Sequence, residues 1–261
     1  MERLTRERER ERSSGLTGTG LRVWGLICIA LGIIGSCVIE RRLLGVGTMT
    51  NQQLLEAMQS SSSAMAMAST AIVLHAIETC AAPVFCFLLV EGFLHTSNAK
   101  NYFIRVFALA VLTEIPFNFA MSGEFINFGS RNPVFGLILC LAVLYFYHRY
   151  REKGFVNILV KILVTVAAFL WCGMLSISEG ACCLILTLVI WALRDKPVYR
   201  DYAGAVAAVL CSLFNPFYLA APMGFLLVHF YNGEKGEGNR FFGYLAYPVL
   251  LAFAGAAVHY F

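Results

Sequence analysis

Charged side chains are scarce in this chain, since Asp, Glu, Lys and Arg together make up 14% of its 261 residues. A soluble globular domain carries roughly a quarter, so the composition excludes an ordinary soluble domain. Hydrophobic residues make up 59%. Several windows of about 20 residues are nearly free of charge, and each is long enough to cross about 30 Å of hydrocarbon as a helix. The composition predicts an all-α polytopic membrane protein that contacts the lipid bilayer.

The chain also lacks the short motifs of several binding and enzyme classes. It has no Walker loop, no dinucleotide-binding fingerprint and no nucleophile elbow at a convincing position. Its nine cysteines include no CxxC pair and lie mostly in apolar runs, where cysteine packs as a small hydrophobic residue. His75 and Glu78 have the spacing of some carboxylate metal sites, but no matching set from other helices accompanies them. We therefore predict no metal site and no disulfide framework.

The beginning of the chain is a polar arm. Residues 1–12 interleave Arg with Glu, so their charges nearly cancel, and this balance argues against a nucleic-acid partner. We expect residues 1–20 to form a charged cytoplasmic arm and residues 21–261 to form a single transmembrane helical domain. Within that domain, residues 40–68 are predicted to be an extracytoplasmic loop, in which a short interfacial helix near 52–58 precedes a flexible serine-rich tether.

The apolar runs predict a bundle of about nine transmembrane helices. The seventh and eighth are short, and Asn215-Pro216 between them favours a turn. One broken or re-entrant element, giving eight helices in all, is therefore the alternative. Pro83 should kink the second helix, because proline removes a backbone hydrogen bond. The nine predicted ranges are about 21–39, 69–94, 100–121, 133–150, 155–174, 178–193, 202–216, 219–231 and 242–261.

The positions of Lys and Arg favour the nine-helix arrangement. With the N-terminus inside, the cytoplasmic side receives most of the basic residues, and the outside receives only Arg41, Arg42 and Arg131. Cytoplasmic loops carry an excess of basic residues in membrane proteins. The pattern predicts an N-terminus inside and a C-terminus outside. The eight-helix alternative would move Lys235 and Arg240 to the outside.

Several ionisable residues lie at or near membrane depth, where a charge is costly and marks a functional-site candidate. Glu91 and His95 are four residues apart and share one helix face. A carboxylate beside an imidazole raises its basicity, as a general base requires; the alternative is a structural pair at the membrane edge. Arg105 is placed to bind a phosphate or carboxylate, to snorkel to the interface or to pair with Glu91. Glu114 lies about 13 Å further along the same helix, so its partner must come from another helix or from water.

Two blocks of sequence resemble the TraX family of bacterial membrane proteins. The first block runs from Pro83 through Glu91-Gly92 and His95-Thr96 to Glu114-Ile115-Pro116-Phe117. The second block is Tyr231-Asn232-Gly233-Glu234-Lys235-Gly236, and Tyr247-Pro248 follows it in the last helix. The resemblance covers about 75–250, and the two blocks are fairly specific in combination.

The resemblance implies an integral membrane acyltransferase of the bacterial inner or cell membrane. The namesake of the family, from conjugation, acetylates the N-terminus of a pilin subunit. This chain is accordingly expected to transfer an acetyl group from acetyl-CoA to an amine or a peptide N-terminus, with a pilin-like acceptor as its partner. The catalytic candidates are Glu91, His95 and Glu114. The candidates for holding the anionic acetyl-CoA are Arg105, Asn232 and Lys235.

The sequence also departs from the family pattern. The first helix of the family usually carries an Asp-His pair, whereas residues 21–39 contain neither Asp nor His. The closing motif usually ends in histidine, but here it reads Tyr247-Pro248-Val249-Leu250. An expected Asp-Tyr-Gly is replaced by Ser178-Glu179-Gly180. The alternative prediction is a catalytically impaired family member that acts as a membrane binding or assembly factor.

Overall fold

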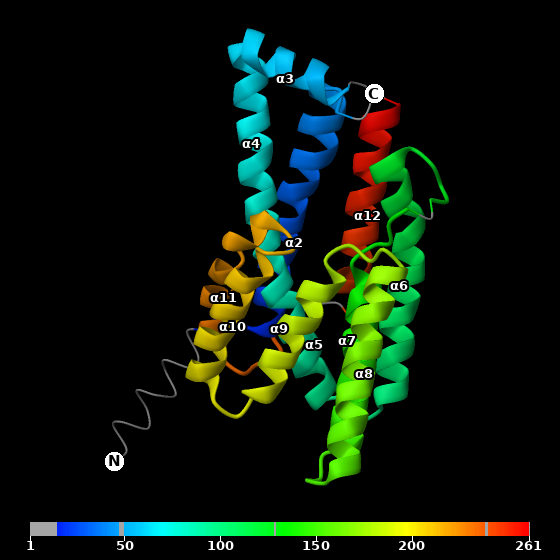
Figure 1. Ribbon diagram of the computed structural model, residues 1–261, viewed down its shortest axis with the longest axis vertical. Helices are drawn as coiled ribbons and strands as arrows, with labels where there is room; N and C mark the ends of the chain where they lie inside the picture. The colour runs from blue at the N-terminus through cyan, green and yellow to red at the C-terminus, as the bar shows by residue number, and fades with distance from the viewer. Residues whose placement is uncertain (1–14, 47–49, 128, 238–239, 261) are drawn as a thin grey trace.

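The computed structural model describes residues 15–46, 50–127, 129–237 and 240–260. Within these ranges no β-strand occurs, and the regular elements are helices (Figure 1). The prediction of an all-helical fold is thereby confirmed. The elements in chain order are α2 (Gly18–Ile33), the π-helix η1 (Ile34–Leu43), α3 (Asn51–Ser60), α4 (Ser62–Thr79), α5 (Ala81–Leu94), α6 (Ala99–Ser122), α7 (Val134–Arg149), α8 (Phe155–Met174), α9 (Gly180–Ala192), α10 (Pro197–Cys211), the 3-10 helix η2 (Pro216–Leu219), α11 (Pro222–His229) and α12 (Arg240–His259).

Among the described residues, four helical stretches are long and apolar enough to cross a membrane, namely Gly18–Leu43, Ser62–Leu94, Ala99–Ser122 and Phe155–Met174. Three further apolar helices are shorter, namely Val134–Arg149, Gly180–Ala192 and Gly243–His259. α10 and α11 have 15 and 8 residues, which rise only about 22 and 12 Å, less than the 30 Å or so of a hydrocarbon core. The protein is a helical membrane protein, while the count of nine crossings and their orientation stay predictions.

The predicted second helix differs from the observed structure at both its start and its interior. The observed helix α4 begins at Ser62, whereas the predicted helix began near 69. The Ser61 side chain caps α4 by accepting a hydrogen bond from the Ala64 N–H at 3.3 Å. The serine run is thus a helix start, and the flexible tether predicted there was wrong. The short helix expected just before it is confirmed as α3.

The break in this helix also lies earlier than expected. α4 ends at Thr79 and α5 begins at Ala81, so the chain is interrupted at Cys80, three residues before Pro83. Pro83 therefore occupies the first turn of α5, where a missing backbone N–H costs no hydrogen bond within that helix. The proline does mark a discontinuity, but the discontinuity is a boundary between two helices rather than a kink within one.

The core lies where α5, α7 and α9 pack together, around fully buried side chains such as Val84, Leu144 and Leu184. α6 pairs with α12, and α2 pairs with α4, while α8 lies on the outer side of α7 and α9 (Figure 1). The ends of three core helices meet at one end of the bundle. There the Phe93 ring lies 5.9 Å from the His148 ring and 5.8 Å from the Trp191 ring. This end also holds the segment that follows α11, and it positions the candidate site.

Candidate functional site

Glu91 and His95 meet at the end of α5, as their spacing predicts. His95 is the residue at which the helix stops, and its Nδ1 lies 3.6 Å from Glu91 Oε1. The same Nδ1 lies closer, at 3.0 Å, to the backbone carbonyl oxygen of Glu91. The His95 side chain is 73% exposed and the Glu91 side chain 24% exposed. The imidazole is therefore held mainly by the helix end, and its contact with the carboxylate is long.

Tyr231 approaches Glu91 from the segment after α11. Its hydroxyl donates to Glu91 Oε1 at 3.4 Å, and its ring meets the Phe87 ring edge-on at 5.1 Å between centroids. Burial, together with the neighbouring Glu91 carboxylate, raises the pKa of Tyr231 to about 12. The phenol thus stays protonated at neutral pH and remains a hydrogen-bond donor to Glu91. Two parts of the family-like sequence, far apart in the chain, are joined in this way.

The segment that contains Asn232 and Lys235 is docked on the start of α2. The Asn232 N–H donates to the Leu16 carbonyl at 3.0 Å, and the Lys235 carbonyl accepts from the Thr19 N–H at 3.0 Å. Asn232 Oδ1 accepts from the Glu234 N–H at 2.9 Å, which closes a tight turn. Lys235 uses its backbone for docking, and its side chain is exposed. The segment therefore presents the Lys235 ammonium to solvent at the end of the bundle where Glu91 lies.

A cluster that sequence reasoning missed lies next to this segment. Asp201 in the first turns of α10 accepts from Arg200 Nε at 2.9 Å through its Oδ1. Its Oδ2 lies 3.0 Å from Nδ1 of His229, the last residue of α11. Arg200 and Asp201 are 9% and 8% exposed, and the Arg200 guanidinium lies 4.7 Å from the centroid of the Phe87 ring. Phe87 also contacts Tyr231, so the cluster is continuous with the Glu91 end of α5.

This cluster lines a cavity of about 610 Å³. The lining residues are Pro197, Val198, Arg200, Asp201, Val228, His229, Tyr231, Asn232, Gly233 and Glu234. The His229 side chain is 56% exposed, whereas the Asp201 side chain is 10% exposed. A buried carboxylate that holds Nδ1–H of an exposed imidazole leaves Nε2 available to take a proton. The Asp201 and His229 pair thus has the geometry in which a carboxylate orients an imidazole.

No short motif marks the Arg200, Asp201 and His229 cluster in the sequence. Asp201 and His229 are 28 residues apart and lie on different helices. Arg200 and Asp201 are adjacent, and adjacent residues do not face each other on a helix by spacing alone. The predicted helix there began at 202, which left both residues in a loop. The only signal in the sequence that could have pointed to the cluster was the pair of adjacent charges, Arg200 and Asp201, near the start of a helix.

Glu114 is paired elsewhere in the molecule. Its Oε1 accepts from Arg131 Nη1 at 2.7 Å, and its Oε2 accepts from Asn132 Nδ2 at 2.6 Å. The prediction that Glu114 needs a partner from outside its own helix is confirmed. Asn132 precedes α7, whereas Phe93 of α5 contacts the opposite end of α7. The length of α7 separates the two places by roughly 24 Å, so the structure does not bring Glu114 to Glu91 and His95.

Arg105 is exposed on α6. Its guanidinium carbon lies 5.8 Å from the centroid of the Tyr102 ring, a distance at which a cation is attracted to the face of an aromatic ring. The Tyr102 hydroxyl donates to the Leu89 carbonyl of α5 at 3.4 Å. Arg105 is thus placed near α5 through Tyr102. Its guanidinium faces away from the protein interior.

The sequence profile of the TraX protein matches residues 57–256. The chain belongs to the TraX protein family. The match starts after α2 and η1. A protein of Dichelobacter nodosus named probable fimbrial assembly protein FimC, serogroup H1, is 28% identical over 196 residues, which is 65% of this chain and 76% of the relative. No solved structure matches the chain.

The family match contains both the predicted and the newly found site residues. Glu91, His95, Arg105 and Glu114 lie within it, and so does the docked segment from 231 to 236. The Arg200, Asp201 and His229 cluster also lies within it. The TraX resemblance predicted from the two sequence blocks is therefore confirmed. Among the residues that the structure describes, no group of three or more His, Cys, Asp and Glu side chains is placed to hold a metal ion.

Proposed function

We propose that this TraX family member is a bacterial membrane acyltransferase that moves an acetyl group from acetyl-CoA to an amine or a peptide N-terminus. The family match supports the class of protein, and the name of the Dichelobacter relative supports a fimbrial or pilin-like acceptor. The observation that carries the proposal is the His229 imidazole, held by the buried Asp201 carboxylate in a cavity of about 610 Å³.

The chemistry assigns a role to each group in this cavity. With its Nδ1–H directed to Asp201, His229 takes the proton of the acceptor amine at Nε2 while the amine nitrogen bonds to the thioester carbonyl carbon. The carbon–sulfur bond then breaks, and the departing CoA thiolate takes up that proton. Arg200 Nε donates to Asp201 Oδ1, so the other carboxylate oxygen, Oδ2, is the one that meets the imidazole.

Binding of acetyl-CoA, a polyanion, is assigned to the same end of the bundle. Asn232 lines the cavity, and the exposed Lys235 ammonium lies three residues further along the same docked turn. Arg105 is exposed near the end of α5. Charge-assisted hydrogen bonds to phosphate are stronger than neutral ones. We expect Lys235 and Arg105 to contribute to affinity and His229 to contribute to the chemical step.

Two histidines compete for the role of base, and the geometry favours His229 over the originally predicted His95. The His229 Nδ1 contact to a buried carboxylate is 3.0 Å, whereas the His95 contact to Glu91 is 3.6 Å and its ring is 73% exposed. A base that is held in one orientation loses less entropy in the transition state. Glu91 then acts through Tyr231, whose ring lies at the wall of the cavity.

The test separates binding from transfer in the purified full chain. We expect His229→Gln to lower transfer by about 100-fold or more and to leave acetyl-CoA binding by isothermal titration nearly unchanged. Lys235→Ala and Arg105→Ala should weaken binding by about tenfold for each 1.4 kcal/mol lost. His259→Gln is the control. His259 is the last residue of α12, and its Nε2 contacts the carbonyl of Phe119 at 3.0 Å, near the end of α6 that lies far from Arg105. Absence of any acetyl-CoA-dependent heat at millimolar ligand contradicts the enzyme assignment.

An assembly factor without catalysis is the second candidate function. Its specific support is the printed name of the fimbrial relative, together with two departures from the expected family pattern inside the match, Ser178-Glu179-Gly180 and Tyr247-Pro248-Val249-Leu250. The two candidates differ in the product. Mass spectrometry of a pilin-like subunit co-purified with this chain shows an added acetyl group under the first and an unmodified N-terminus under the second.

The finer topology is part of the same proposal. We place the start of α2 in the cytoplasm and the end of α12 outside, with about nine passes, because basic residues concentrate on the proposed inner side. In Figure 1 the start of α2 and the end of α12 lie towards opposite ends of the molecule, which supports an odd number of passes. The cavity beside His229 then opens to the cytoplasm, where acetyl-CoA is available.

A further inference from the structure

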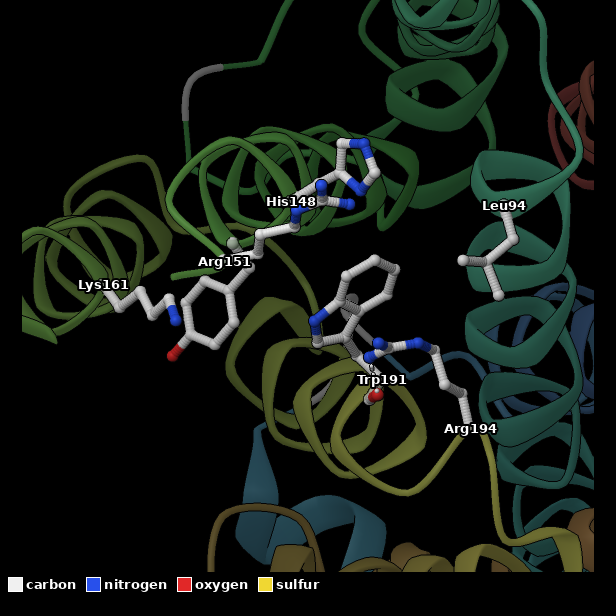
Figure 2. Close-up of a pocket in the computed structure, with 7 residues that line it drawn as sticks. Leu94, His148, Arg151, Lys161, Trp191 and Arg194 are labelled. Carbon is white, nitrogen blue, oxygen red and sulfur yellow. Dashed lines mark hydrogen bonds between the residues drawn. The ribbon is translucent and has the colours of Figure 1, made fainter. Parts of the chain in front are cut away.

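A second cavity lies at the same end of the bundle, beside Leu94 at the end of α5. It has a volume of about 310 Å³ and lies where α5, α7 and α9 end and α8 begins (Figure 2). Its lining residues are Leu94, Tyr147, His148, Arg151, Lys161, Trp191 and Arg194. Three of these side chains are cationic at neutral pH, a fourth is histidine, and none is acidic. The cavity shares no lining residue with the one beside His229.

The aromatic walls of this cavity orient its cations. The Arg194 guanidinium carbon lies 4.3 Å from the centroid of the Trp191 ring, and Arg194 Nη1 donates to the Trp191 carbonyl at 2.9 Å. Lys161 Nζ lies 5.9 Å from the centroid of the Tyr147 ring. Figure 2 shows Arg151, Lys161 and Arg194 on different elements around Trp191. Stacked and tethered cations lose less side-chain entropy when an anion binds between them.

The acidic residues nearby leave most of this positive charge uncompensated. Asp195 Oδ2 lies 3.9 Å from Arg194 Nη2, but its side chain is 84% exposed. Glu152 is also exposed, and its backbone carbonyl accepts from Asn157. Exposed ion pairs contribute little binding energy. A phosphate is the anion that best matches a cavity with two guanidinium groups and an ammonium group.

The wall formed by α8 favours a lipid phosphate. Only 11% of the apolar window of this helix is buried inside the protein, so most of its surface is available to hydrocarbon. Lys161 lies six residues, or about 9 Å, from the start of the helix. Exposed apolar side chains flank it in sequence, namely Ile158 (53%), Leu159 (43%), Ile162 (55%) and Leu163 (57%). A charged head in the cavity would therefore have acyl chains lying against α8.

We propose that this cavity binds the headgroup of an anionic phospholipid, with the phosphodiester among its cationic side chains and the acyl chains on the outer face of α8. Basic pockets between membrane helices on the cytoplasmic side bind anionic lipid headgroups in other proteins. The inference is independent of acyl transfer, because it uses another cavity and other residues. Bound lipid would bridge α8, which packs mainly against α7 and α9, to the rest of the core.

The test compares lipids that share the same acyl chains and differ in the headgroup and its net charge. The full chain in neutral detergent is titrated with dioctanoyl phosphatidylglycerol or dioctanoyl phosphatidylcholine, and bound lipid is measured by native mass spectrometry. The wild type should prefer the anionic lipid by about tenfold or more, and the double variant Lys161→Gln, Arg194→Gln should lose that preference. The matched control is Lys153→Gln, Arg149→Gln, which removes the same two charges from exposed side chains outside the cavity.

Two further measurements test the proposal even if the first double variant folds poorly. Lys161→Arg, Arg194→Lys preserves both charges and should keep the preference for phosphatidylglycerol. Inorganic phosphate and acetyl-CoA are added as competitors, and neither should displace the lipid at equal concentration. Equal binding of the two lipids by the wild type overturns the proposal. So does an equal loss in the control pair, or displacement of the lipid by a soluble phosphate compound.

Discussion

At the scale of single residues, the site depends on ionisable groups whose partners come from other parts of the chain. Asp201 is the clearest case, because its two oxygens serve Arg200 from the same helix and His229 from the next helix. The Glu91 carboxylate is similar, since it receives the Tyr231 hydroxyl from a segment 140 residues away in sequence. Such groups are stable inside a membrane protein only when paired.

The Asp201 carboxylate should matter for stability as well as for the imidazole. We expect Asp201→Ala to lower the free energy of unfolding by about 3–5 kcal/mol, because it leaves the nearly buried Arg200 guanidinium without its anion. The double variant Asp201→Ala, Arg200→Met should recover much of this loss. Thermal unfolding of the purified protein in detergent measures both. Equal destabilisation by the single and double variants would contradict the pairing.

A glycine that follows the docked turn sets a tight contact with the start of α2. Gly236 has a φ of +74°, and a Cβ on it would clash with Thr17 Oγ1. Gly236→Ala should therefore cost about 1–2 kcal/mol from the backbone alone and should loosen the segment that carries Lys235. Limited proteolysis between α11 and α12 should be faster in this variant. Gly233→Ala is the comparison, because its φ is +85° but no atom lies within 4 Å of the added Cβ.

At the scale of elements, the ends of helices carry more of the proposed chemistry than their middles. His95 stops α5, His229 ends α11, and Asp201 lies in the first turns of α10. Helix ends have unpaired backbone groups that bind side chains and ligands. The middles of α5, α7 and α9 supply apolar packing instead. The proposed site residues thus lie at helix ends, and the apolar core lies between the middle parts of the helices.

Glu114 tests the difference between a structural and a catalytic carboxylate. It joins α6 to the start of α7 through Arg131 and the fully buried Asn132. We expect Glu114→Ala to destabilise the protein by about 1–3 kcal/mol, because these donors lose their acceptor, and to leave transfer by the folded protein nearly unchanged. Denaturant unfolding and the acetyl-transfer assay measure the two effects. A loss of transfer without a loss of stability would restore the catalytic role predicted for Glu114 from its motif.

At the scale of the whole molecule, the arrangement places two cavities and many basic side chains at one end of the bundle. The cavity beside His229 lies where α10 begins and α11 ends, and the cavity around Trp191 lies where α7 and α9 end. The core between them is apolar and contains the fully buried side chains of α5, α7 and α9. The two cavities therefore have separate lining residues, and each proposal can be tested without altering the other.

The topology makes a prediction for the whole chain. A periplasmic reporter fused after Phe261 should be active, because nine passes from a cytoplasmic N-terminus leave the C-terminus outside. Cysteine accessibility gives an independent check. A cysteine placed at Lys235 should be labelled by a membrane-impermeant reagent only after the cytoplasmic side is opened. A cytoplasmic signal from the fusion would reject the odd number of passes and the proposed side of the cavities.

The sequence alone determined the class of protein, the helical fold and the family. Long runs without charge exclude a soluble domain, because the cost of burying charge in hydrocarbon shapes composition throughout a membrane chain. The Glu91 and His95 contact was also predictable, since residues four apart share a helix face. These are local or compositional properties, and they do not depend on which helices pack together.

Tertiary structure decided which distant side chains meet. The Asp201 and His229 pair, the Glu114 and Arg131 pair, and the docking of Asn232 on Leu16 join residues whose spacing in the chain carries no signal. It also placed the interruption of the predicted second helix at Cys80, three residues before the kink expected at Pro83. Helix packing fixes these contacts because each depends on the orientation of two or more helices at once. Local sequence rules describe one helix at a time.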